Sequence, residues 1–178
     1  GGWRDHLGVP IAKQLETLAT FSSGKPASNG NSVAVDVARP LDAATVTTFQ
    51  RNIGRVCNQA CRHCHVDAGP LRTETMSREI ADACLEVIRS TPEIQTVDIT
   101  GGAPEMNAVF RPLVVESRKA GKHVIDRCNL TILSQPGYED LADFLAEHQV
   151  EVIASLPHFA AARTDKQRGR GTFDASII

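Results

Sequence analysis

Three cysteines dominate the stretch Cys57-Asn58-Gln59-Ala60-Cys61-Arg62-His63-Cys64. Three residues separate the first pair and two residues separate the second pair, which gives the spacing C-x3-C-x2-C. Thiolates this close together can bind three irons of a cubane iron–sulfur cluster and leave the fourth iron without a protein ligand. An open position is typical of a catalytic metal site, whereas a structural site closes its coordination shell. The alternative is a zinc site completed by His63 or His65.

The sequence around this stretch alternates between strand and helix patterns. β-branched and alternating apolar residues predict strands at 45–49, 94–100, 123–128 and 150–155. Apolar residues at helical spacing predict helices at about 76–88, 110–120 and 141–145, and a fourth helix that begins at Thr172. A basic loop is expected at 163–170. The pattern predicts an α/β fold with a parallel sheet, in which functional loops follow the carboxyl ends of the strands.

The composition excludes several classes of protein. The chain has 178 residues, 42% of them hydrophobic, and 19 Lys and Arg against 21 Asp and Glu give a net charge of −2. This balance argues against a nucleic-acid partner or a membrane-surface partner. No apolar run reaches the roughly 18–20 residues of a membrane span, and the beginning of the sequence has no secretory apolar region. We therefore expect a cytoplasmic protein.

The polar and glycine-containing residues at 22–32 predict a flexible linker. We therefore expect two regions, an N-terminal helix (11–21) with this linker at 1–32 and the α/β core at 33–178.

The five cysteines do not indicate a disulfide scaffold, because their number is odd and their density is low. Cys84 belongs to the apolar stripe of a predicted helix and is expected in the core. Cys128 ends the third predicted strand, where it could face a pocket or be an inert buried thiol.

The positions of these motifs resemble the radical S-adenosylmethionine (SAM) superfamily. Its C-x3-C-x2-C motif follows the first strand, and the residue before the third cysteine, here His63, is usually aromatic. Gly101-Gly102-Ala103-Pro104-Glu105 resembles the glycine-rich turn that receives the SAM amino group. Asn129 and Ser155 match the polar positions after strands three and four. The resemblance implies that Cys57, Cys61 and Cys64 bind a [4Fe-4S] cluster and that the other positions contact SAM.

A closer resemblance covers residues 45–178 and is to the arsenosugar biosynthesis radical SAM family. It is carried by the segments 57–70, 98–107, 123–131, 154–157 and 165–169. The sequence departs from the family at His158, where many relatives have cysteine. The family also has a C-terminal cysteine-rich domain, which these 178 residues do not include. The superfamily core is a partial barrel of six βα units, and this sequence accounts for about four. We therefore expect a truncated, incomplete barrel.

The resemblance implies that the enzyme cleaves SAM to a 5′-deoxyadenosyl radical and adenosylates a dimethylarsenic species. Cys128 and His158 are the expected catalytic residues. The expected partners are a small-molecule substrate and a flavodoxin-type or ferredoxin-type reductant. Two alternatives remain at this point, which are a radical SAM enzyme with another substrate and a zinc-stabilised module without catalytic activity.

Overall fold

The computed structural model describes residues 45–177. The expected N-terminal helix at 11–21, the linker at 22–32 and the boundary at residue 33 lie outside this range. None of the helices within the described range has the length and apolar character needed to cross a membrane.

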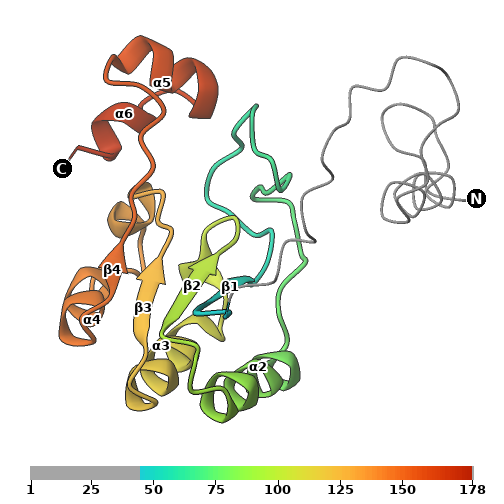
Figure 1. Ribbon diagram of the computed structural model, residues 1–178. Helices are drawn as coiled ribbons and strands as arrows, with labels where there is room; N and C mark the ends of the chain where they lie inside the picture. Colours follow the sequence, from blue (N-terminus) through green and yellow to red (C-terminus); the bar gives the residue numbers. More distant parts are fainter. Residues whose placement is uncertain (1–44, 178) are drawn as a thin grey trace, which may run out of the picture. The chain divides into compact units, whose positions relative to one another are not determined.

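A four-stranded parallel sheet organises the described chain (Figure 1). Its strands are β1 (Thr48–Asn52), β2 (Thr96–Thr100), β3 (His123–Asp126) and β4 (Glu151–Val152), and they lie in the order β1-β2-β3-β4. The register pairs Asn52 with Thr100, Ile99 with Asp126 and Asp126 with Val152. The carboxyl ends of the strands therefore meet at one edge, as the α/β prediction required.

Helices connect the successive strands. They are α2 (Arg78–Ser90), α3 (Phe110–Lys119) and α4 (Leu141–Glu147), and the short helices η1 (Pro104–Met106) and η2 (Thr131–Ser134) follow β2 and β3. Ser77 caps α2, because its Oγ accepts a hydrogen bond of 3.3 Å from the backbone N–H of Ile80.

The core lies between the sheet and these helices. Val97, Ile99 and Val124 from the strands are at most 2% exposed, and Phe110 and Leu141 from the helices are fully buried in the same cluster. Burying each such side chain contributes roughly 1.5–3 kcal/mol relative to exposing it. This packing holds the strand ends at fixed positions and so supports the loops that follow them.

Several local predictions differ from the structure, and the second and third strands are each two residues shorter than expected. The first strand begins at Thr48 rather than at residue 45, and the fourth contains two residues rather than six. The expected basic loop is largely a helix, α5 (Ala161–Arg168), which precedes α6 (Thr172–Ala175). Only Thr164 of α5 is buried, so this helix has no apolar stripe by which its sequence could be recognised.

Candidate functional site

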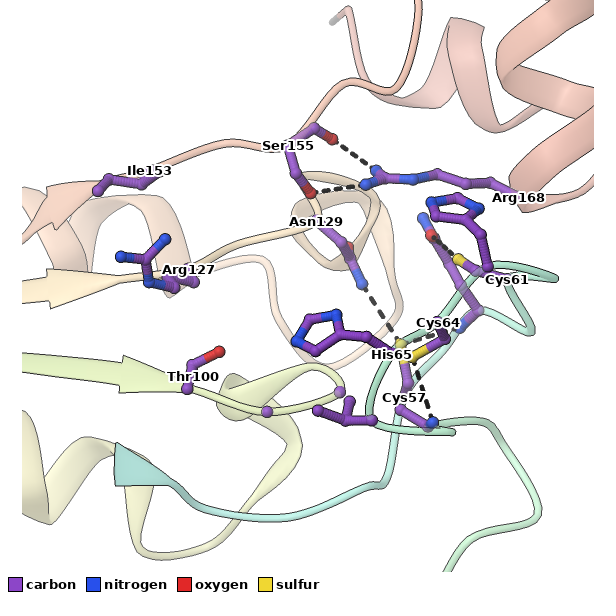
Figure 2. A pocket seen from close by; sticks show the side chains of 16 residues that line it. Cys57, Cys61, Cys64, His65, Thr100, Arg127, Asn129, Ile153, Ser155 and Arg168 are labelled. Carbon is purple, nitrogen blue, oxygen red and sulfur yellow. Dashed lines mark hydrogen bonds between the residues drawn. The ribbon is translucent and has the colours of Figure 1, made fainter. Parts of the chain in front are cut away.

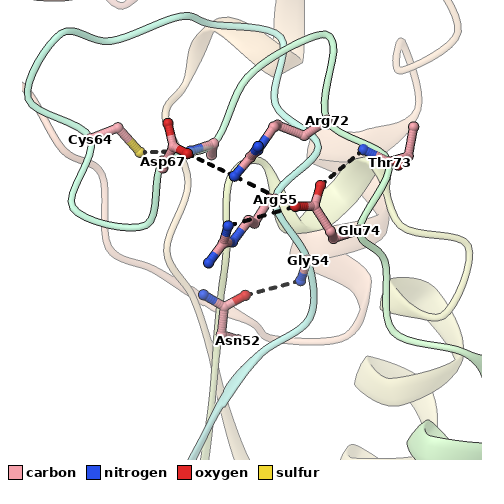
Figure 3. Close-up of polar contacts among 9 residues, drawn as sticks. Asn52, Gly54, Arg55, Cys64, Asp67, Arg72, Thr73 and Glu74 are labelled. Carbon is pink, nitrogen blue, oxygen red and sulfur yellow. Dashed lines mark hydrogen bonds and ion pairs between the residues drawn. The ribbon is translucent and has the colours of Figure 1, made fainter. Parts of the chain in front are cut away.

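The three cysteines lie on the long loop between β1 and α2. Backbone hydrogen bonds join the two arms of this loop: the N–H of Cys57 donates to the carbonyl of Gly69 at 3.3 Å, and the N–H of Gly69 donates to that of Arg55 at 3.0 Å. Figure 3 shows the polar contacts at its base, where Arg72 pairs with Asp67 at 2.7 Å and with Glu74 at 3.5 Å. The loop therefore has a defined shape although it contains few regular elements.

The glycine turn after β2 packs directly against the cysteine loop. The N–H of Gly102 donates to the carbonyl of Gly54 at 3.0 Å, and the N–H of Ala103 donates to that of Val56 at 2.9 Å. A Cβ atom on Gly102 would collide with the Val56 carbonyl and would lie 2.9 Å from the Cβ of Cys57. Glycine at this position thus allows the two loops to meet backbone to backbone.

These loops enclose a pocket of about 250 Å³ at the carboxyl edge of the sheet. Figure 2 shows its lining, to which the cysteine loop and the ends of β2, β3 and β4 all contribute. Eight of the residues expected from sequence line it, namely Cys57, Cys61, His63, Cys64, Gly101, Gly102, Asn129 and Ser155.

The other five expected residues do not line this pocket. Ala103, Pro104 and Glu105 are buried behind the glycine turn. Cys128 is 1% exposed in the core, whereas its neighbour Arg127 lines the pocket, as the alternation of side chains along an extended chain requires. His158 lies in a separate shallow cavity with Arg62 and Arg163.

A polar network that sequence reasoning missed connects the cysteine loop to the turn after β3. The Thr131 hydroxyl accepts hydrogen bonds from the Asn58 amide at 2.8 Å and from the Gln59 amide at 2.7 Å. The Asn129 amide donates to Asn58 Oδ1 at 2.7 Å and approaches the Cys57 sulfur at 3.7 Å. Two amide residues inside the cysteine motif were the signal that could have suggested such a network.

Two arginines also shape the pocket, and one of them, Arg168, belongs to the basic segment expected at 163–170. Arg168 from α5 donates to the carbonyl and the hydroxyl of Ser155, at 2.5 and 2.6 Å. Arg127 donates to the carboxylate of Asp98 at 2.7–3.1 Å, and Gln50 donates to the same carboxylate at 2.9 Å. Both arginines contribute positive charge to the pocket wall.

The environment of the sulfur atoms affects their ionisation. Burial raises the pKa of the Cys57 thiol, while hydrogen bonds from the Gln59 N–H and the Asn129 amide act in the opposite direction. Burial also raises the pKa of Cys61, against the charge of Arg168. The N–H of Ala68 donates to the Cys64 sulfur at 3.3 Å. Because a metal ligand must be a thiolate, the hydrogen bonds to Cys57 favour the form of that residue that binds.

The spacing of the sulfur atoms tests which group the triad can bind. Within residues 45–177, the one group of at least three ligating side chains whose donor atoms all lie within 4.8 Å of one another is Glu105, Asp126 and Cys128. Cys57, Cys61 and Cys64 do not form such a group, so at least one pair of their sulfur atoms lies more than 4.8 Å apart. Neighbouring ligands of one tetrahedral zinc ion, with Zn–S bonds of about 2.3 Å, would lie roughly 3.8 Å apart. All three cysteines are free thiols. This donor set fits a cluster with several metal atoms better than it fits one zinc ion.

Comparison with known proteins identifies a family for this chain and solved structures with a similar fold. A family model described as the radical SAM superfamily matches residues 52–177. Two solved structures match with TM-scores of 0.57: SuiB from Streptococcus suis, at 12% identity over 71% of this chain, and native anSMEcpe with bound AdoMet, at 17% identity over 72% of this chain. The aligned region spans 28% and 38% of these two chains, respectively. No curated protein sequence matches significantly.

Proposed function

Because this chain belongs to the radical SAM superfamily, whose enzymes use a [4Fe-4S] cluster and SAM, we propose that Cys57, Cys61 and Cys64 bind such a cluster and that SAM binds beside it. The observation that carries the proposal is the pocket itself. It brings the three cysteines together with the glycine turn and with Asn129 and Ser155. The chemistry that the bound cluster supplies is the one-electron reductive cleavage of SAM to methionine and a 5′-deoxyadenosyl radical.

The residues of the chain position the two groups. We assign Gly101 and Gly102 to the SAM amino group, since both line the pocket beside the cysteine loop. The guanidinium of Arg168, held by Ser155, offers positive charge for a carboxylate. His63, on the cysteine loop, is proposed as a further contact to SAM.

For the substrate, we propose a dimethylarsenic species, which would be joined to the 5′ carbon of the adenosyl group. This proposal is supported by the resemblance of segments 57–70, 98–107 and 123–131 to the arsenosugar biosynthesis family. His158 would have to move before it could act as an acid or a base, because it lies in a separate cavity and its Nδ1 accepts a hydrogen bond from the N–H of Ala160. The Cys128 thiol would need an opening towards the pocket before it could contact substrate, because it is 1% exposed.

We further propose a flavodoxin-type or ferredoxin-type reductant and a cytoplasmic location. The exposed residues Arg62 and His63 lie between the second and third cysteines and so provide an accessible approach to the cluster loop. A one-electron donor must come close to the cluster, and this segment is an exposed part of its binding loop.

Anaerobic reconstitution tests the first step. The loaded chain should contain about four irons and four sulfides, and should release 5′-deoxyadenosine from SAM when a reductant is added. A colourless protein that binds one zinc through the cysteine loop would contradict the assignment and support a zinc-stabilised module.

Product analysis tests the substrate. With SAM and a dimethylarsenic compound, the reaction should give a product in which arsenic is bonded to the adenosyl 5′ carbon. SAM cleavage without this product would retain the radical SAM activity and point to a different substrate, which is the second candidate function.

A further inference from the structure

A second group of ligating side chains lies behind the pocket. Glu105 belongs to η1, Asp126 ends β3, and Cys128 follows two residues later. The three side chains are 6%, 0% and 1% exposed, and their donor atoms all lie within 4.8 Å of one another. Folding therefore brings two carboxyl groups and a thiol into one enclosed position.

The carboxyl groups in this position have no conventional hydrogen-bond partners. None of the four oxygen atoms of Glu105 and Asp126 accepts a hydrogen bond from an N–H or hydroxyl group of the described chain. Their polar neighbours are each other and Cys128, so the groups can satisfy one another only by retaining protons. An unpaired buried carboxylate is costly, which means that either protons or a cation must compensate these groups.

We infer that Glu105, Asp126 and Cys128 form a binding site for one structural divalent cation of the zinc class. Carboxylate oxygen and cysteine sulfur are both zinc ligands, and the thiol distinguishes this donor set from the all-oxygen sites that magnesium and calcium prefer. If one carboxylate binds through both of its oxygens, the three residues supply the four donors of a closed zinc site. Because the site is enclosed, we expect the cation to be bound as the chain folds.

The position of the site indicates what the cation would stabilise. Glu105 follows the glycine turn at 101–102, and Cys128 precedes Asn129, which contacts the cysteine loop. A cation here would join the turn after β2 to the turn after β3 behind the pocket wall. It would hold the two turns together without taking part in SAM chemistry, so its presence does not depend on the proposed function.

The pKa values of Glu105 and Asp126 are consistent with carboxylates whose buried negative charge must be compensated. Burial raises the pKa of Glu105. Burial, followed by the charge of Glu105, raises the pKa of Asp126 to about 9. Without a cation, Asp126 would therefore retain its proton at neutral pH and share it with Glu105. This shared proton is the competing explanation that the experiment must exclude.

The test uses the full chain with Cys57, Cys61, Cys64 and Cys84 all replaced by serine. Of the five cysteines, this variant retains only Cys128. After expression with zinc, it should contain about one zinc per chain. After expression with cobalt, it should show a thiolate-to-cobalt charge-transfer absorption, which only Cys128 could produce.

Further variants in this background assign the other ligands. Asp126→Asn and Glu105→Gln should each lower the zinc content at least tenfold. Asp98→Asn replaces another buried acid and should not change the zinc content. Zinc removal by a chelator should lower the Tm of the background variant but not that of Asp126→Asn. If the background variant is folded but contains no zinc, the inference is wrong and a shared proton explains the buried carboxyl groups. If the variant binds zinc but the cobalt-loaded sample shows no thiolate absorption, Cys128 is not a ligand and the inference is also wrong.

Discussion

Gly102 is the residue at which the two principal loops of the candidate site meet. Its N–H donates a hydrogen bond to the carbonyl of Gly54, and the space that a Cβ would need is occupied by atoms of Val56, Ala68 and Cys57. The requirement for glycine is therefore steric, because a side chain would separate the glycine turn from the cysteine loop.

Gly102→Ala should therefore destabilise the fold by about 1–3 kcal/mol, as expected for an atom inserted into a packed region. It should also lower the amount of iron bound after reconstitution. Urea unfolding and iron analysis measure the two effects. Gly69→Ala is the matched control, since a Cβ there would have only an ordinary contact of 4.0 Å with the Gln59 carbonyl. Equal stability of the two variants would contradict the steric argument.

Cys61 and Cys84 provide a second comparison at the residue scale. Cys61→Ala should abolish cluster binding, because it removes one of three proposed ligands. Cys84→Ala should retain the cluster, since Cys84 is a buried thiol on α2 whose sulfur accepts a hydrogen bond of 3.1 Å from Arg51. Iron and sulfide analysis after anaerobic reconstitution compares the cluster content of the two variants. The same iron content in both variants would show that the assignment of Cys61 is wrong.

At the scale of the elements, a polar row crosses the first three strands. Gln50 of β1 and Arg127, which follows β3, both donate to Asp98 of β2. The Asp98 side chain is 5% exposed, whereas that of Arg127 is 42% exposed and faces the pocket. The row therefore links the strands and also fixes a cationic group at the pocket wall.

The Asp98 row predicts a dependence of stability on pH. Burial acts to raise the pKa of Asp98, but the hydrogen bonds from Arg127 and Gln50 and the charge of Arg127 hold it below its usual value. The pair therefore stabilises the fold above the unfolded pKa of about 3.9, and this contribution is lost as the pH falls through the lower folded value.

Asp98→Asn should lower the free energy of unfolding by about 1–2 kcal/mol at pH 7, because it weakens charged hydrogen bonds. The difference from the unchanged chain should narrow below about pH 4, where Asp98 becomes protonated in the unfolded chain and then in the folded chain. Urea unfolding at several pH values measures this, with the exposed residue Glu93 replaced by Gln as the control. A difference that does not change with pH would exclude the ion pair as its cause.

On the scale of the whole molecule, one apolar core supports all the turns at the carboxyl edge. Phe110 is fully buried and lies at the start of α3, and it packs with residues from the sheet and from α2 and α4. Its position connects the layer of helices to the strands whose ends carry the candidate site.

Phe110→Ala should reduce the free energy of unfolding by about 3–5 kcal/mol, because it leaves a large cavity in the core. Leu71→Ala is the control for loss of an apolar side chain, since Leu71 is 96% exposed, and it should change stability by less than about 0.5 kcal/mol. Denaturant unfolding monitored by circular dichroism compares the two. If the two variants lost similar amounts of unfolding free energy, Phe110 would not organise the core as the structure indicates.

The sequence by itself determined the fold class, because the alternation of strand and helix patterns depends on local periodicity and on turn residues. The spacing of Cys57, Cys61 and Cys64 predicted a metal site, and the resemblance to the radical SAM superfamily added the glycine turn, Asn129 and Ser155. Residues of all four line the pocket. The α5 helix was missed because its residues have no apolar stripe.

Only the tertiary structure decided which side of β3 each side chain faces. It placed Arg127 in the pocket and Cys128 in the core, and it brought Glu105 to Asp126 and Cys128 across 21 or more residues of sequence. The bonds from Asn58 and Gln59 to Thr131 likewise span more than 70 residues. Such contacts depend on strand register and crossover geometry, which local sequence patterns do not specify.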